Sequence, residues 1–179
     1  MENQDNILNN ENLKATIDVE EQKIISLNKF IFLSIISFGA YGLWWIYKAW
    51  SFHKQKNKLD IWPASRAILS FFFLESLFRK ILSFSKEKGY SKNYSSTLLF
   101  IGYFVANFLS YLPDPFWLIS ILSFLFLIPP FEALNYAKQN SNDFITTEQN
   151  SFSERQIWLI VGGIIFWIFV LLVIVIGDV

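Results

Sequence analysis

Cysteine is absent from the 179 residues of this sequence, and histidine and methionine each occur only once. The lack of cysteine excludes disulfides, thiolate metal sites, catalytic thiols and lipids attached through sulfur. Charged side chains are also scarce, at 17% of the chain, against about a quarter in soluble domains. Fifteen basic and fifteen acidic residues leave no net charge, and this balance argues against a nucleic acid as partner.

Motifs that carry enzyme or cofactor chemistry are missing as well. The sequence has no phosphate-binding Gly-x-x-x-x-Gly-Lys loop, no His-Glu-x-x-His and no Gly-x-Ser-x-Gly. His53 has no second metal ligand beside it and is expected to be a solvated loop residue. We therefore expect a protein that is not an enzyme and that holds neither a metal ion nor a cofactor.

Apolar side chains are what the sequence has in excess. Hydrophobic residues make up 53% of the chain and aromatic residues 19%, and lipid is the environment that accepts such an excess. The expected fold is therefore all-α. We predict a polytopic membrane protein with three to four transmembrane helices and one interfacial amphipathic helix.

The apolar segments define a helical membrane domain over residues 29–179, preceded by a polar tail over residues 1–28. Spans are predicted near residues 30–50, 93–113, 115–131 and 157–177. Gly39 and Gly42 interrupt the first segment, which fits either a continuous span or a re-entrant helix pair, and we favour the continuous span. Four spans place the N-terminal tail outside, whereas three spans and a re-entrant segment place it in the cytoplasm.

Prolines and glycines mark two further features of the predicted spans. Pro113 and Pro115 end one helix and begin the next, so residues 93–131 are expected to form a helical hairpin with its turn outside. Gly162 and Gly163 in the last span allow another helix to approach closely.

Charge distribution sets the predicted orientation. Ten of the fifteen basic residues lie between Lys48 and Lys92, together with only three acids, so the positive-inside rule places this region in the cytoplasm. Within it, residues 64–84 are predicted to form the interfacial helix. The apolar face of that helix consists of Leu74, Leu77, Phe78 and Ile81. Glu75 and Arg79 have the spacing of an ion pair on one helix.

Two groups of side chains are candidates for binding. The candidates for contact with lipid headgroups are Lys48, Lys54, Lys56, Lys58, Arg79 and Lys80. Each basic residue at a membrane surface attracts anionic lipid by about 1 kcal/mol, although the same residues fit a role in orientation alone. The candidates for an intramembrane polar path are Tyr103, Asn107 and Ser110. Hydrogen bonding between packed helices is the alternative role of this second group.

The stretch FLSIISFGAYGLWWIYKAW, residues 32–50, combines an aliphatic run, a turn and an aromatic cluster that ends in a basic residue. The positions that carry this pattern are Ser37, Phe38, Gly39, Tyr41, Trp45, Tyr47 and Lys48. The pattern resembles a bacterial membrane family known as domain of unknown function 4234. The stretches PASRAILSFFFLESLFRKI and YLPDPFWLISILSFLFLIPP are similar to its long members, which extends the resemblance over residues 29–177. The resemblance implies a bacterial inner-membrane location and no functional residue.

The expected function is that of a small structural or accessory protein, multi-pass in the bacterial inner (plasma) membrane. Its expected partners are the lipid bilayer, anionic lipids, and a membrane protein or a second copy of the chain. The alternative is a transporter or channel component that uses the polar path near Asn107.

Overall fold

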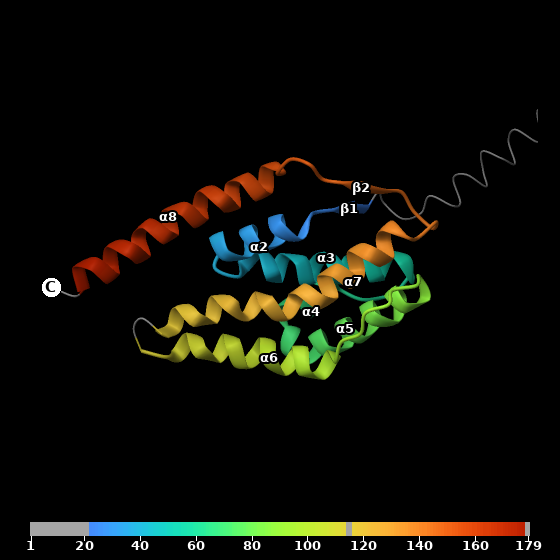
Figure 1. Cartoon of the computed structure of the whole chain (residues 1–179), viewed down its shortest axis with the longest axis horizontal. Coiled ribbons are helices and arrows are strands. Elements are labelled where there is room, and N and C mark those ends of the chain that lie inside the picture. Colours follow the sequence, from blue (N-terminus) through green and yellow to red (C-terminus); the bar gives the residue numbers. More distant parts are fainter. Residues whose placement is uncertain (1–21, 114–115, 178–179) are drawn as a thin grey trace, which may run out of the picture.

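The computed structural model describes residues 22–113 and 116–177, and most of the predicted polar tail lies outside these residues. The described chain is mostly helical (Figure 1). Its two short strands, β1 (Gln22–Ile24) and β2 (Thr146–Glu148), pair in parallel with Gln22 opposite Thr146. Ile24 and Ile25 are buried, so the last residues of the predicted tail belong to the folded domain.

The first apolar segment forms two helices, α2 (Leu27–Ile36) and α3 (Ala40–Lys56), that fold back on each other (Figure 1). The Phe30 ring lies 6.0 Å from the rings of both Tyr41 and Trp45. A straight helix would separate residues 30 and 41 by about 16 Å. The prediction of a continuous span is therefore wrong, and the helix pair that was its alternative is the observed structure.

Backbone conformation at Phe38 and Gly39 produces this reversal. Phe38 has φ of 53° and Gly39 has φ of 83°, a left-handed region that glycine enters without steric cost but that a bulky residue rarely adopts. The Phe38 ring is held 5.4 Å from the ring of Trp117 and 5.3 Å from that of Phe166. Aromatic packing around Phe38 thus offsets the strain of its backbone.

A second hairpin joins residues 96–111 to residues 116–139, as predicted. The first arm is α6 (Ser96–Phe108), continued by the 3₁₀ turn η1 (Leu109–Tyr111). The second arm is the 3₁₀ helix η2 (Phe116–Leu127), continued by α7 (Ile128–Gln139). The helix type changes at Pro129 and Pro130, which occupy the first turn of α7, where a missing N–H costs nothing. Asp114 and Pro115, in the predicted turn, lie outside the described residues.

The predicted interfacial helix is two helices, α4 (Pro63–Ile68) and α5 (Ser70–Glu87), which meet at Leu69. The predicted apolar face of α5 is fully buried against α3, α6 and α7, so protein rather than lipid covers it. The exposed apolar residues around the junction of α4 and α5 are Trp62, Ile68, Leu69, Phe71 and Phe72. The predicted ion pair is present, with Arg79 Nη2 3.4 Å from Glu75 Oε2.

The last helix, α8 (Glu154–Gly177), lies along one side of the molecule and contacts the rest mainly through α2 (Figure 1). Within the described residues, two helical stretches are long and apolar enough to cross a membrane, Phe116–Gln139 and Glu154–Ile176. In the first stretch the charge-free part ends at Phe131, and the following turns carry Glu132 and Lys138.

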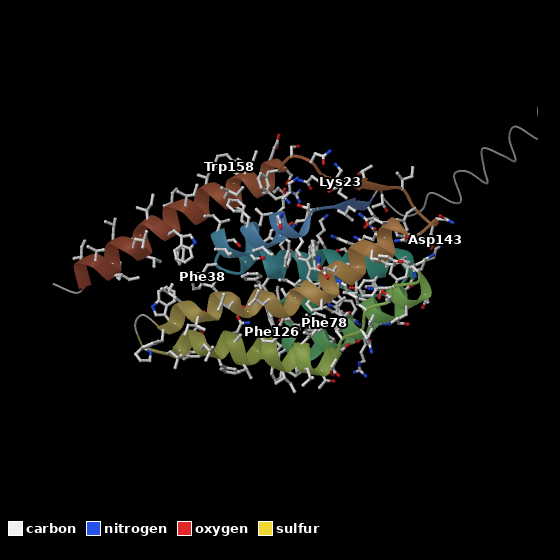
Figure 2. All side chains as sticks on the ribbon, in the orientation of Figure 1. Lys23, Phe38, Phe78, Phe126, Asp143 and Trp158 are labelled. Atoms are coloured by element: carbon white, nitrogen blue, oxygen red, sulfur yellow. The ribbon has the colours of Figure 1, made fainter. Side chains whose placement is uncertain are left out.

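Charges gather at one end of the fold. The hairpin turns and the C-terminal end of α8 point toward the left in Figure 1, while the strands and the polar half of α7 lie on the right. Lys23 and Asp143 mark this polar end in Figure 2, and Phe38 lies toward the apolar end. The opposite end is free of charge in the part of the chain that the structure describes: residues 30–47 and 156–177 include no Asp, Glu, Lys or Arg.

Candidate functional site

The larger of two described cavities, here called the basic cavity, has a volume of about 760 Å³. Its walls come from β1, α3, α7, the segment after β2 and the first turns of α8. A volume of this size falls in the range of small-molecule and cofactor sites. The basic cavity therefore has room for a ligand far larger than an inorganic ion.

One face of α3 forms the longest wall of the basic cavity. Ala40, Trp44, Lys48, Ser51 and Gln55 line it at helical spacing, which at 1.5 Å per residue covers about 22 Å. Along this row of residues the side chains are apolar at Ala40 and Trp44 and polar at Lys48, Ser51 and Gln55. The cavity thus has an apolar end, directed toward the charge-free part of the fold, and a cationic end.

Four basic side chains line the cavity: Lys23, Lys48, Lys138 and Arg155. No carboxylate lies among its lining residues in the part of the chain that the structure describes. Two of the cations lie near the Trp44 ring: Lys48 Nζ is 5.6 Å and the Arg155 guanidinium is 5.9 Å from the ring centroid. Clustered cations without carboxylates form a positive potential that attracts anions.

Lys138 is the most unusual of the four cations, because its side chain is buried with a relative exposure of 8%. Its ammonium lies 4.5 Å from the centroid of the Phe52 ring, and no described carboxylate pairs with it. Burial and, second, the nearby charge of Lys48 lower the pKa of Lys138 to about 8. A buried cation without a counter-ion is costly, so this position is suited to an anion that enters the cavity.

Hydrogen bonds between neutral groups fix the wall of the basic cavity that the start of α8 forms. The Gln156 side chain is buried, and its Nε2 donates to the Tyr41 hydroxyl at 3.2 Å. Its Oε1 accepts from Gln149 Nε2 at 2.7 Å and from the Ser153 backbone N–H at 2.9 Å. These bonds join the start of α8 to α3 and to the segment after β2. The Arg155 side chain is therefore carried on a rigidly anchored turn.

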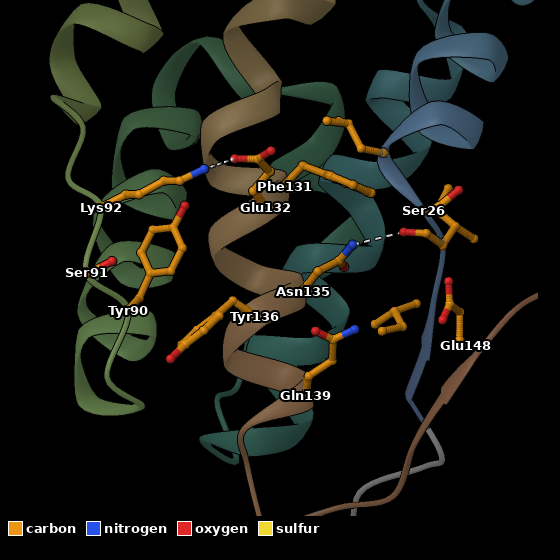
Figure 3. Close-up of a pocket in the computed structure, with 13 residues that line it drawn as sticks. Ser26, Tyr90, Ser91, Lys92, Phe131, Glu132, Asn135, Tyr136, Gln139 and Glu148 are labelled. Atoms are coloured by element: carbon orange, nitrogen blue, oxygen red, sulfur yellow. Dashed lines mark hydrogen bonds and ion pairs between the residues drawn. The ribbon is translucent and has the colours of Figure 1, made fainter.

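A second cavity, of about 440 Å³, is lined by residues of β1, of α7 and of the segment between α5 and α6 (Figure 3). Its central charges are paired, because Lys92 Nζ lies 3.2 Å from Glu132 Oε2. Asn135 Nδ2 donates to the Ile25 carbonyl oxygen at 3.0 Å. Glu148 adds a further carboxylate to the lining. The second cavity thus contains both acids and bases, and its central charges already neutralise each other. The basic cavity is therefore the better candidate for a ligand site.

The predicted headgroup residues do not all reach one site. Lys48 lines the basic cavity, whereas the other five lie outside both described cavities. Lys56 Nζ lies 3.9 Å from the centroid of the Phe84 ring, and Arg79 pairs with Glu75. Lys54 of α3 and Lys80 of α5 are half-buried, and Lys58 is exposed in the turn after α3. Lys23, Lys138 and Arg155 complete the cavity, and none of these three was a predicted site residue.

His53 corrects another expectation, because it is not solvated. Its relative exposure is 1%, and neither ring nitrogen has a hydrogen-bond partner. The ring packs edge-on against Phe52 and Phe84. Burial first, and then the charges of three nearby lysines, lower the pKa of His53 to about 3. The imidazole is thus neutral and serves as a core side chain.

The three residues of the predicted polar path differ in their exposure. Tyr103 is buried, while Asn107 and Ser110 are exposed. Asn107 Nδ2 donates to the Tyr103 carbonyl oxygen at 2.8 Å, one turn earlier in the same helix. The amide is therefore satisfied locally, without a solute or a neighbouring helix. None of the three residues lines either described cavity.

Comparison with known proteins identifies no relative: no family model matches the sequence, and no curated protein or solved structure is detectably similar. The resemblance to domain of unknown function 4234 therefore stays a prediction.

Proposed function

We propose that this chain is an integral membrane protein whose basic cavity binds an anionic lipid. Three membrane crossings are proposed: α6 with η1, η2 with the first turn of α7, and α8. The hairpin of α2 and α3 is proposed as a re-entrant pair. The basic cavity lies where these elements meet the membrane surface, and the protein acts as an accessory protein rather than as an enzyme.

Apolar exposure supports the membrane location. Ile165 and Phe169 of α8 have relative exposures of 64% and 63%, and most residues of this helix are exposed. Its length of 24 residues corresponds to about 36 Å, enough for a hydrocarbon core of about 30 Å. Lipid is the environment in which such an exposed apolar helix is stable.

Dimensions and backbone bonding support the re-entrant pair. The 10 residues of α2 rise by about 15 Å, half of a hydrocarbon core. Carbonyl groups at the end of a helix within lipid need internal partners. Ile35 O accepts from the Phe38 N–H at 3.1 Å and from Trp167 Nε1 at 3.3 Å. The tip of the pair is thus closed by its own turn and by α8.

Both ends of the re-entrant pair lie at the polar end of the molecule, which predicts three crossings with the N-terminal tail in the cytoplasm. Because the chain lacks cysteine, single-cysteine labelling tests this topology. An impermeant reagent added outside should react with Pro113→Cys but not with Asn28→Cys or Asp60→Cys. Labelling at Asn28→Cys would instead support four crossings.

The observation that carries the proposed ligand is the set of four cations without a described carboxylate, one of them buried and unpaired. An anionic headgroup would neutralise them, while the apolar end of the cavity would receive part of the lipid chain. The resemblance to the bacterial inner-membrane family agrees with this location. A soluble anion would make no use of the apolar half of the α3 wall.

Lipid retention tests the proposed function. The protein, purified in mild detergent and exchanged repeatedly, is analysed by native mass spectrometry for bound lipid. We expect anionic phospholipid to remain at one copy per chain and zwitterionic phospholipid to be lost. Retention of neither, or of both in proportion to their abundance in the membrane, would refute the proposal. The same spectra report any second copy of the chain or co-purifying protein.

A further inference from the structure

Resting on the proposed function, we propose that the basic cavity is selective for a lipid whose headgroup carries at least two negative charges, such as a terminal phosphomonoester or a diphosphate. The headgroup is expected between Lys48 and Lys138, with Arg155 beside it. The chain of the lipid leaves along α3, past Trp44 and toward Leu159 of α8.

The arrangement of the two lysines carries the inference of multiple charge. Lys48 of α3 and Lys138 of α7 line the same cavity, and the charge of Lys48 disfavours protonation of the buried amine. A phosphodiester with one negative charge neutralises one of the two and leaves the other unpaired. A phosphomonoester carries about −1.5 to −2 charges and three acceptor oxygens, so it can accept from both ammonium groups at once.

The place of Lys138 makes this a built site rather than a charged surface. Its side chain is more than nine-tenths buried, lines the cavity and has no described counter-ion. Its ammonium lies 4.5 Å from the centroid of the Phe52 ring, and none of the described ion pairs includes it. Arg155 adds a guanidinium, whose planar fork matches the oxygens of a phosphate.

The apolar half of the cavity identifies the ligand as an amphiphile. Ala40, Trp44 and Leu159 line this half, next to the segments that we assign to the membrane. A free phosphate would occupy only the cationic end and would leave this wall in contact with water. A lipid buries it, so the acyl chain contributes to binding together with the headgroup.

The experiment uses the full-length protein in nanodiscs of zwitterionic phosphatidylcholine, doped at equal mole fraction with phosphatidic acid or phosphatidylglycerol. Occupancy is read by native mass spectrometry, and inorganic phosphate and pyrophosphate are added in separate arms. We expect phosphatidic acid to bind roughly tenfold more tightly than phosphatidylglycerol, as one additional charge-assisted hydrogen bond predicts. The soluble anions should bind more weakly than either lipid.

Three variants make the test specific. Lys138→Met and Lys48→Met should each remove the preference for phosphatidic acid over phosphatidylglycerol. Lys54→Met, which removes the same charge from α3 outside the cavity, should keep it. Lys48 is exposed, so its variant remains informative if Lys138→Met does not fold.

The outcomes separate the inference from the proposed function. Equal binding of phosphatidic acid and phosphatidylglycerol, both above phosphatidylcholine, would overturn the charge selectivity and leave anionic lipid binding intact. No preference over phosphatidylcholine would overturn both. Pyrophosphate binding as tight as that of phosphatidic acid would overturn the amphiphile, and loss of selectivity in Lys54→Met would overturn the assignment to the cavity.

Discussion

Docking of α8 on α2 depends on the absence of a side chain at one glycine. A Cβ at Gly163 would overlap the carbonyl oxygen and carbonyl carbon of Ile36. The neighbouring Gly162 has no atom within 4 Å of the same position. These adjacent glycines in one helix therefore form a matched pair: Gly163→Ala forces α8 away from α2, and Gly162→Ala does not.

The expected magnitudes follow from helix propensity and from overpacking. Alanine stabilises a helix interior by about 1 kcal/mol relative to glycine, and this gain applies at both positions. Overpacking costs about 1–3 kcal/mol, and it applies only at Gly163. Separation of the helices also stretches the 3.3 Å hydrogen bond from Trp167 Nε1 to the Ile35 carbonyl, which adds about 1 kcal/mol.

We therefore expect Gly162→Ala to match or exceed the wild-type thermal stability in detergent. Gly163→Ala should be less stable than Gly162→Ala by about 2–4 kcal/mol, the sum of the overpacking and hydrogen-bond costs. For a chain of this size the difference corresponds to a melting temperature lower by about 4–16 °C. Hydrogen exchange at residues 34–42 should increase only in Gly163→Ala. Equal stability and exchange in the two variants would refute the packing of α8 on α2.

Three further predictions concern single residues. Gly39→Ala should lower the free energy of unfolding by about 1–2 kcal/mol, since φ is 83° and no atom crowds the site; an unchanged unfolding midpoint would contradict the left-handed turn. The stability of the wild type should fall as pH drops from 6.5 toward 3, because His53 has a folded-state pKa of about 3 and only the unfolded chain takes up its proton; His53→Phe should lack that part of the slope in thermal melts. Stability without lipid should rise between pH 8 and 10.5, where the unfolded chain binds the proton that folded Lys138 has released. Over that interval the free energy of unfolding of the wild type should rise relative to that of Lys138→Met by about 3 kcal/mol, from 1.36 kcal/mol per pKa unit. A constant difference between the two free energies would argue against burial of the charged amine.

Local signals made the second hairpin predictable from the sequence. Prolines at positions 113 and 115 end helices through their own ring geometry, whatever surrounds them. The apolar face of α5 was equally predictable, because its residues repeat at helical spacing. What the pattern could not distinguish was a face covered by lipid from a face covered by α7, since both environments select the same side chains.

Tertiary contacts decided the features that sequence reasoning missed. The reversal between α2 and α3 is stabilised by the Phe30 ring, which stacks 4.3 Å from the ring of Phe131 on α7. No local pattern encodes a contact between residues so far apart in the chain. Gly39 signalled an interruption, but it could not show whether the chain bends or turns back.

Lys138 was missed because the predicted span ends at residue 131 and the polar segment after it was not assigned to a helix. A signal was present in that segment. Leu134, Ala137 and Lys138 share the helical face of Phe131, at spacings of three, six and seven residues from it. Such a stripe extends the helix beyond the prolines and places the lysine on its buried side. The stripe could reveal the position of the cation, but the absence of a described counter-ion is visible only in the folded chain.

The turn at Phe38 and Gly39 connects the proposed membrane part of this protein to the basic cavity. Because α3 turns back there, Trp44 and Lys48 face the start of α8 and the polar half of α7. A continuous helix over the same residues would carry Lys48 to the far side of the bilayer from β1, and the four cations could not share one cavity. The positive φ values and the proposed binding of an anionic lipid are therefore linked. A variant that straightens this turn should lose the ligand as well as the fold of α2, even though Phe38 and Gly39 do not line the cavity.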